Sequence, residues 1–432
     1  MREERPGLRR AAIALQHRDY RLFYIALLVA GIGGQIQTFA NVLQIYHLTG
    51  SALSLGLTGL ARAIPIIAFS LMGGIIADRV DRVRFSMVAQ GLGGSFSVIL
   101  AFLTWTEMID VWHIYLFTFL VSSVQALNTP ARSAIIPNLV PRHHLLNAIA
   151  LNSTVWQTSN IMGPTIAGFA IAAIGFVPTY FIDGVAQIVS ISTLAMIHVG
   201  RVTARSNQSP IRGLVEGLSF VRHRSIIMVL LAADCGETFF ARYQALLPIV
   251  AANVGAGAAG LGILSAGPGI GSLVGATLVM SLGDFRYKGI VVVGAILAYC
   301  CALVVLALSP WLALAVVATF LLGVFDSLQA TPRNGVIQLL TPDNLRGRVS
   351  SFQSMLTSGV PPLGQAQMGA VVSVVGAPVA MIIGASICAA LQLGLVTTRS
   401  DLRAADLGAR EPEVRPVPVA AQVPSPSGRE RG

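Results

Sequence analysis

The sequence predicts an all-α membrane protein with twelve transmembrane helices, arranged as two six-helix pseudo-repeats. Three observations support this prediction. First, 54% of the 432 residues are hydrophobic, only 11% are charged, and the mean hydropathy is +0.72, which exceeds the apolar share of a soluble globular protein. Second, basic residues recur between alternate apolar segments. Third, the second half of the chain repeats landmarks of the first.

Twelve apolar segments approach or exceed the length of about 20 residues that a helix needs to cross a bilayer. In the first half they are 21–46, 52–77, 84–104, 111–128, 148–174 and 177–198. In the second half they are 225–252, 258–282, 289–308, 311–331, 348–375 and 377–397. We expect helices, because a spanning backbone must satisfy its own hydrogen bonds. Tight turns are expected at Gly175 and Gly376.

The basic residues predict the topology. All but two of the 29 Lys and Arg residues, Arg62 and Arg242, lie in the terminal segments or in alternate loops. By the positive-inside rule this places both termini in the cytoplasm. The net charge of +10 therefore reflects topology, and it does not indicate a nucleic-acid partner.

The internal repeat divides the chain into two halves. Pro65 recurs as Pro268, and Thr129-Pro130 recurs as Thr331-Pro332. An even number of spans in each half makes the repeats parallel in the membrane, with a substrate site between them near the midplane. The expected segments are an N-terminal cytoplasmic stretch, a six-helix bundle, a linker with an interfacial helix, a second six-helix bundle and a disordered tail, at 1–20, 21–198, 199–224, 225–398 and 399–432.

A short polar stretch between the second and third spans carries a dense set of charges. Its residues are Gly74, Asp78, Arg79, Asp81 and Arg82. Such charges cannot lie in hydrocarbon, so we expect a tight turn at the membrane surface, where a glycine allows close helix packing. Spacing alone leaves open a charged loop that only enforces orientation.

This Gly-x-x-x-Asp-Arg-x-x-Arg pattern resembles the signature of the major facilitator superfamily of secondary transporters. The Asp-Arg-x-Asp-Arg form, after a Pro-bearing second span, resembles the branch that includes the enterobactin exporter and related drug efflux pumps. The resemblance runs from about Tyr20 to Thr398, and it implies the major facilitator fold and an efflux function in a bacterial cytoplasmic membrane.

We expect the charged stretch to form an inner gate with basic residues at other helix ends. These residues are Arg132, Arg333 and Arg346. They could pair with Asp78, Asp81 and Asp284 when the cytoplasmic side closes.

In the fifth span, Gly163, Pro164 and Gly168 resemble the antiporter motif of the superfamily, with Ala167 in place of one glycine. Proline opens a backbone hydrogen bond and bends a helix, and glycines permit tight contact with neighbours. The alternative is a packing kink that has no bearing on the direction of transport.

Ionisable residues inside spans indicate function, because each is costly unless it is paired or hydrated. Asp234 and Glu237 are three residues apart and share one helical face. Asp326 is the other deeply placed acid. Because nearby carboxylates in a low dielectric favour the protonated form of at least one, these three acids are proton-coupling candidates. The alternative is a structural ion pair with Arg242 or Arg62.

Polar residues in several spans could line a cavity for a large amphipathic solute. The candidates are Gln35, Thr38, Asn41, Arg62, Trp156, Gln157 and Arg242. Arg62 could hold an anionic group of the substrate or pair with an acid across the cavity. Each candidate could instead hold neighbouring helices together through polar contacts.

The sequence thus predicts a monomeric secondary transporter that exports small amphipathic molecules, of drug or siderophore type, by proton antiport with alternating access. The alternative is an importer or uniporter of a small metabolite or lysolipid. We expect no enzyme, cofactor or metal: there is no His-Glu-x-x-His or Gly-x-Ser-x-Gly pattern and no nucleotide-binding Gly-Lys-Ser/Thr loop. The expected partners are the solute, protons and the lipid bilayer.

Overall fold

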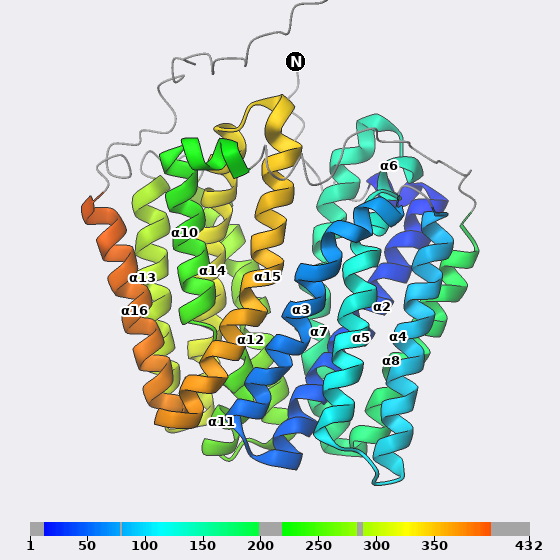
Figure 1. Cartoon of the computed structure of the whole chain (residues 1–432), viewed down its shortest axis with the longest axis horizontal. Helices are drawn as coiled ribbons and strands as arrows, with labels where there is room; N and C mark the ends of the chain where they lie inside the picture. Colours follow the sequence, from blue (N-terminus) through cyan, green and yellow to red (C-terminus); the bar gives the residue numbers. More distant parts are fainter. Residues whose placement is uncertain (1–12, 78–79, 198–217, 283–287, 399–432) are drawn as a thin grey trace, which may run out of the picture.

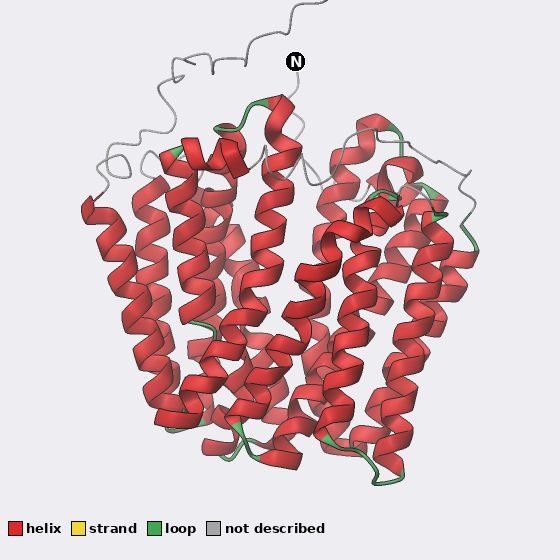
Figure 2. Ribbon diagram, viewed as in Figure 1, coloured by secondary structure: helices red, strands yellow, loops and turns green. Residues whose placement is uncertain are grey.

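A computed structural model of the chain describes residues 13–77, 80–197, 218–282 and 288–398. These residues form helices joined by short loops, and no strand occurs among them (Figure 2). The first half comprises η1 (Ile13–Gln16), α2 (Arg18–Thr49), α3 (Ala52–Ala77), α4 (Arg82–Trp105), α5 (Val111–Ser133), α6 (Ile136–Leu139), η2 (Arg142–His144), α7 (Leu145–Ile174) and α8 (Phe176–Ala195). The second half comprises α10 (Ser225–Phe240), η3 (Gln244–Leu246), α11 (Leu247–Asn253), α12 (Gly257–Leu282), α13 (Lys288–Ala307), α14 (Leu312–Leu339), α15 (Asp343–Val375) and α16 (Ala377–Thr398).

The long helices coincide with the predicted spans. Each expected span except the seventh corresponds to one continuous helix, whose ends differ from the expected ones by several residues. Among the described residues, seven helices are long and apolar enough to cross a membrane by length and composition alone: α2, α3, α4, α12, α13, α14 and α16. The correspondence between the long helices and the expected spans confirms the all-α membrane fold with two six-helix halves.

The seventh span is broken, so the prediction of one continuous helix over 225–252 is wrong. Helix α10 ends at Phe240, and the chain becomes helical again only at η3 and α11. Pro248 at the start of α11 has no N–H to donate to a preceding turn, which removes one bond that a continuous helix needs. In addition, Gly364 of α15 and Gly384 of α16 bring those helices against the backbone of the last turn of α10.

Glycines in the left-handed region end four helices at one end of the bundle. Gly50, Gly175, Gly255 and Gly376 have φ values of 59°, 83°, 66° and 81°, a conformation that costs glycine little. The predicted turns at Gly175 and Gly376 are thus confirmed. We call this the glycine-turn end, and we call the opposite end, which carries α6, the α6 end (Figure 1).

The most extensive contacts between the two halves are those of α3 with α15 and of α7 with α12. Figure 1 shows α3 and α15 converging toward the glycine-turn end and diverging toward the α6 end. A Cβ added to Gly56 of α3 would lie 2.8 Å from the Cα of Gly369 of α15, and the Gln365 side chain donates to the Thr58 hydroxyl at 2.6 Å. The structure thus brings the halves into close contact at the glycine-turn end.

Some predictions fall on parts of the chain outside the described residues. These parts include 1–12, most of the expected linker (198–217) and the tail (399–432). Of the expected interfacial helix, residues 218–223 are described and are helical.

Candidate functional site

A buried polar network connects α10 with α14. The Arg333 guanidinium of α14 forms an ion pair with the Asp234 carboxylate of α10, and it donates a second bond to the Gln329 side-chain oxygen at 2.8 Å. The Gln329 amide in turn donates to the Asp326 carboxylate at 3.3 Å. Arg333 is 4% exposed and Asp234 is 8% exposed, so the ion pair is shielded from solvent on nearly all sides.

Glu237 lies beside this network without a hydrogen-bonding partner for one of its oxygens. It is 4% exposed, and its Oε2 atom is fully buried and makes no hydrogen bond within the described part of the chain. Asp326 and Asp234 are both within electrostatic reach of Glu237. An unpaired carboxylate among other acids is costly to bury in its charged form. The cluster is therefore suited to hold a proton.

The position of Arg333 differs from the prediction that it contributes to the inner gate. Thr331-Pro332 does not end the helix, because α14 continues to Leu339 and contains Pro332 in its interior. Arg333 therefore lies inside the bundle, and its acid partner is Asp234 rather than an acid of the charged stretch. The acids were expected to pair, if at all, with Arg242 or Arg62, and that pairing is not found for Asp234.

Arg62 and Arg242 come from opposite halves and lie near each other. Arg62 is on α3, while Arg242 is in the non-helical break between α10 and η3, and α3 contacts η3. Each side chain is half-buried, and the two guanidinium groups are within electrostatic reach. The break in the seventh span, which the sequence did not predict, is what presents Arg242 at this position.

The polar residues of α2 are largely occupied by contacts within the first half. Asn41 is 8% exposed. It donates to Thr118 of α5 at 3.3 Å and accepts from the Tyr180 hydroxyl of α8 at 2.9 Å. Thr38 donates to the Gly34 carbonyl of its own helix at 2.8 Å. Asn41 thus joins helices rather than lining a cavity, which corrects the prediction for this residue.

Of the remaining polar candidates, Gln157 contacts the other half, Gln35 bonds within the first half, and Trp156 is exposed. Gln35 of α2 donates to Asn160 of α7, which orients both side chains. Gln157 of α7 donates to the Ser272 hydroxyl of α12 at 2.8 Å, across the two halves. Trp156 is 62% exposed.

The charged stretch after α3 is only partly described. Gly74 is in the last turn of α3, while Asp78 and Arg79 lie outside the described residues. Asp81 is the N-cap of α4 and accepts from the backbone N–H groups of Val83 and Arg84, each at 3.1 Å.

Other members of the predicted gate lie at helix ends. Arg82 donates to the Ala134 carbonyl just beyond α5 at 3.1 Å, which ties α4 to the end of α5. Arg132 is in the last turn of α5, and Arg346 is an exposed residue in the first turn of α15. Asp284 is outside the described residues.

The antiporter-like motif of α7 contacts both halves. A Cβ on Gly163 would lie 3.2 Å from the Ile32 carbonyl of α2 in the same half, whereas a Cβ on Gly168 would lie 2.6 Å from the Cα of Gly262 of α12 in the other half. Pro164 is inside the helix between them. The motif therefore packs α7 tightly against α2 in its own half and against α12 in the other half.

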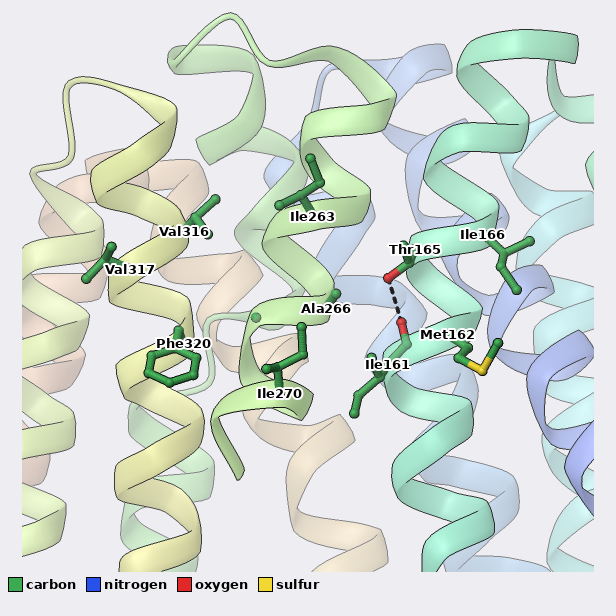
Figure 3. A pocket seen from close by; sticks show the side chains of 11 residues that line it. Ile161, Met162, Thr165, Ile166, Ile263, Ala266, Ile270, Val316, Val317 and Phe320 are labelled. Carbon is green, nitrogen blue, oxygen red and sulfur yellow. Dashed lines mark hydrogen bonds between the residues drawn. The ribbon is translucent and has the colours of Figure 1, made fainter. Parts of the chain in front are cut away.

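An apolar pocket of about 510 Å³ lies between α7, α12 and α14. Figure 3 shows Met162 and Ile166 of α7, Ile263 and Ile270 of α12, and Phe320 of α14 around it. The one hydroxyl in its lining, that of Thr165, donates to the Ile161 carbonyl at 2.7 Å, so the lining is effectively apolar. Along α14 the pocket is about 9 Å from the acid network, at 1.5 Å per residue between Phe320 and Asp326.

Sequence reasoning missed three residues that the structure brings into the site. Gln329 links Asp326 to Arg333, and its spacing of three and four residues from them could have indicated it. Ser272 and Gly262 on α12 carry contacts between the halves. No local signal distinguishes them from the many other small residues of the second half.

Comparisons with known proteins identify the family. The model of the transmembrane secretion effector family matches residues 11–429. The multidrug efflux pump Tap of Mycolicibacterium fortuitum is 25% identical over 355 residues, which cover 79% of this chain and 86% of that protein. The enterobactin exporter EntS of Shigella boydii is 22% identical over 353 residues, which cover 82% and 85% of the two chains.

A solved structure supports the fold. The crystal structure of the nucleoside transporter NupG superposes with a TM-score of 0.67 at 15% identity, covering 88% of this chain and 98% of that one. At this identity the likeness concerns the fold alone. The chain thus belongs to the transmembrane secretion effector family, a branch of the major facilitator superfamily of membrane transporters.

Proposed function

We propose that this transporter exports small amphipathic molecules and is driven by proton entry. The observation that carries the proposal is the cluster of Asp234, Glu237 and Asp326 with one directly paired arginine, in which Asp234 and Glu237 are buried and Asp326 is exposed beside them. Acids placed deep in a membrane bundle without full compensation typically mark ion pathways. The relatives named as efflux pumps and exporters support export as the direction.

In this proposal Glu237 is the main proton carrier and Asp326 the second. Glu237 has a buried oxygen without a partner, whereas Asp234 is held by Arg333 and Asp326 by Gln329. Protonation of Glu237 removes a charge that the surroundings do not compensate. The protonated and deprotonated forms would then favour different packing of α10 against α14, which is what alternating access requires.

The solute-binding part of the proposal consists of the apolar pocket and three polar candidates of the first half. A pocket of about 510 Å³ is within the usual range for small-molecule sites. Gln35, Trp156 and Gln157 could provide the polar contacts. We further propose that the charged stretch after α3 closes the α6 end when the glycine-turn end opens, and that the transporter functions as a monomer of two six-helix domains.

We expect proton flux triggered by solute to depend on Glu237. The measurement uses purified protein in liposomes with an imposed pH gradient, and it follows internal pH while amphipathic dyes, antibiotics and siderophores are added. Glu237→Gln should reduce the coupled flux at least ten-fold, because glutamine keeps the shape and removes the titrating group. Asp326→Asn should reduce it less, since Gln329 already holds that side chain.

Glu107→Gln is the matched control, because Glu107 is an exposed residue in the loop between α4 and α5 and its replacement should leave the flux unchanged. Solute movement in the wild type without proton flux would refute antiport. Undiminished proton flux in both Glu237→Gln and Asp326→Asn would refute the assignment of the carrier.

We also propose that the α6 end faces the cytoplasm of the bacterial cell, so that both termini are cytoplasmic. The support is the alternation of basic residues. Alkaline phosphatase fused after Glu107 should be active, because the glycine-turn end would face the periplasm, and a fusion after Arg142 should be inactive. The reverse pattern would invert the orientation.

A further inference from the structure

Arg62 and Arg242 form a pair of cations in the interior of the bundle. Unlike Arg333, the other arginine inside the bundle, they have no paired acid among the described residues. Arg62 is about 15 Å from the start of α3, at 1.5 Å per residue, which is well within a helix that spans a bilayer. Both side chains are half-buried.

Within the described residues, neither guanidinium forms an ion pair or donates a hydrogen bond. Instead the two lie within electrostatic reach of each other. Asp326 is within electrostatic reach of Arg242, but its hydrogen bond goes to Gln329. The Asp234 carboxylate forms its ion pair with Arg333. The pair is therefore left with repulsion between like charges and no acid that neutralises it directly.

The surrounding packing holds the two arginines in place. Thr58, one turn before Arg62 on α3, accepts a bond from Gln365 of α15 at 2.6 Å, so this part of α3 is clamped against the other half. Arg242 lies two residues beyond the end of α10, whose last turn is closely approached by α15 at Gly364 and by α16 at Gly384. Two like charges that packed helices hold near each other inside a membrane bundle are costly unless a ligand of opposite charge offsets the cost.

We propose that Arg62 and Arg242 together bind the anionic group of an amphipathic solute, a carboxylate, sulfonate or phosphate. Guanidinium groups bind such groups through two parallel hydrogen bonds, and one residue from each half would then contact the same anion. The inference rests on the proposed transport function and names its substrate class. It holds for either direction of transport.

A matched pair of probes tests the proposal. 1-Pyrenebutyrate carries a carboxylate, and 1-pyrenebutyramide is its uncharged analogue with the same apolar body. Binding of each is measured through the thermal stabilisation of purified protein in a neutral detergent. We expect the wild type to bind the carboxylate at least ten-fold more tightly than the amide. Arg62→Gln and Arg242→Gln should each reduce this preference to less than three-fold, whereas Arg62→Lys should retain part of it.

Two controls separate this effect from loss of folding. Arg222→Gln removes an exposed charge outside the long helices and should leave the preference intact. In the absence of ligand, Arg62→Gln should melt at or above the wild-type temperature, because it removes an uncompensated charge from the interior. A lower melting temperature together with an intact preference would instead show a structural role for Arg62.

Three outcomes would overturn the proposal. The wild type could bind both probes equally, or the preference could survive in both Arg→Gln variants. Finally, phosphatidylglycerol in nanodiscs, compared with phosphatidylcholine alone, could abolish binding of the carboxylate, which would assign the pair to a lipid headgroup. No pH gradient is applied in these measurements, so their outcome is independent of whether transport is coupled to protons.

Discussion

Replacing Arg333 with alanine is expected to destabilise the protein by about 3–5 kcal/mol, the range found when one partner of a buried ion pair is removed. The change leaves the Asp234 carboxylate buried without its cation. It also removes the donor to Gln329 and one link between α10 and α14. The measurement is the unfolding of purified protein in detergent, followed by tryptophan fluorescence.

A double variant distinguishes the lost ion pair from a lost side chain. Arg333→Met combined with Asp234→Leu removes both charges and keeps most of the volume, so its stability should approach that of the wild type. If the double variant were as unstable as Arg333→Ala, packing rather than charge would explain the loss. If Arg333→Ala melted like the wild type, the ion pair would have no structural importance.

Replacing Gly168 with valine is expected to reduce solute transport at least ten-fold. A Cβ at this position would lie 2.6 Å from the Cα of Gly262 and 2.7 Å from the Ala258 carbonyl, which are backbone atoms that cannot rotate away. The clash separates α7 from α12 and disfavours the conformation in which the glycine-turn end is closed. Distances between spin labels on the two halves at that end should increase.

Gly34→Val is the matched control, because a Cβ on Gly34 of α2 would meet no atom within 4 Å. This variant should transport normally and keep the wild-type distances. Normal transport by Gly168→Val would show that close contact between α7 and α12 is dispensable. A loss of transport without a change in distance would assign Gly168 to the binding of solute instead.

The site could be predicted in part from residue types and spacing. Asp234 and Glu237 stand out because acids are rare within apolar spans, and their separation of three residues places them on one helical face. Arg62 and Arg242 stand out as exceptions to the distribution of basic residues. These signals identify charged residues that need a compensating partner in the bundle, but they do not identify which residue is that partner. The partner of Asp234 is Arg333, 99 residues away in sequence.

Two predictions failed for a common reason, which is that local signals do not report what surrounds a helix. Thr331-Pro332 resembles a helix end, yet α14 continues past it, so Arg333 belongs to the interior. The seventh span has the composition of one helix, yet α10 ends at Phe240 where α15 and α16 pack against its backbone. In both cases tertiary packing overrides local propensity.

The sequence by itself determined the membrane environment, the twelve spans, the two halves and the turns at Gly175 and Gly376. These properties follow from the hydropathy of whole segments and from the backbone freedom of glycine, which depend little on neighbours. Only the tertiary structure decided that Arg333 neutralises Asp234, that Asn41 joins helices, and that Arg62 and Arg242, from opposite halves, lie within electrostatic reach of each other. Such pairings depend on how each helix is rotated and where it breaks, and the packing of distant residues sets both.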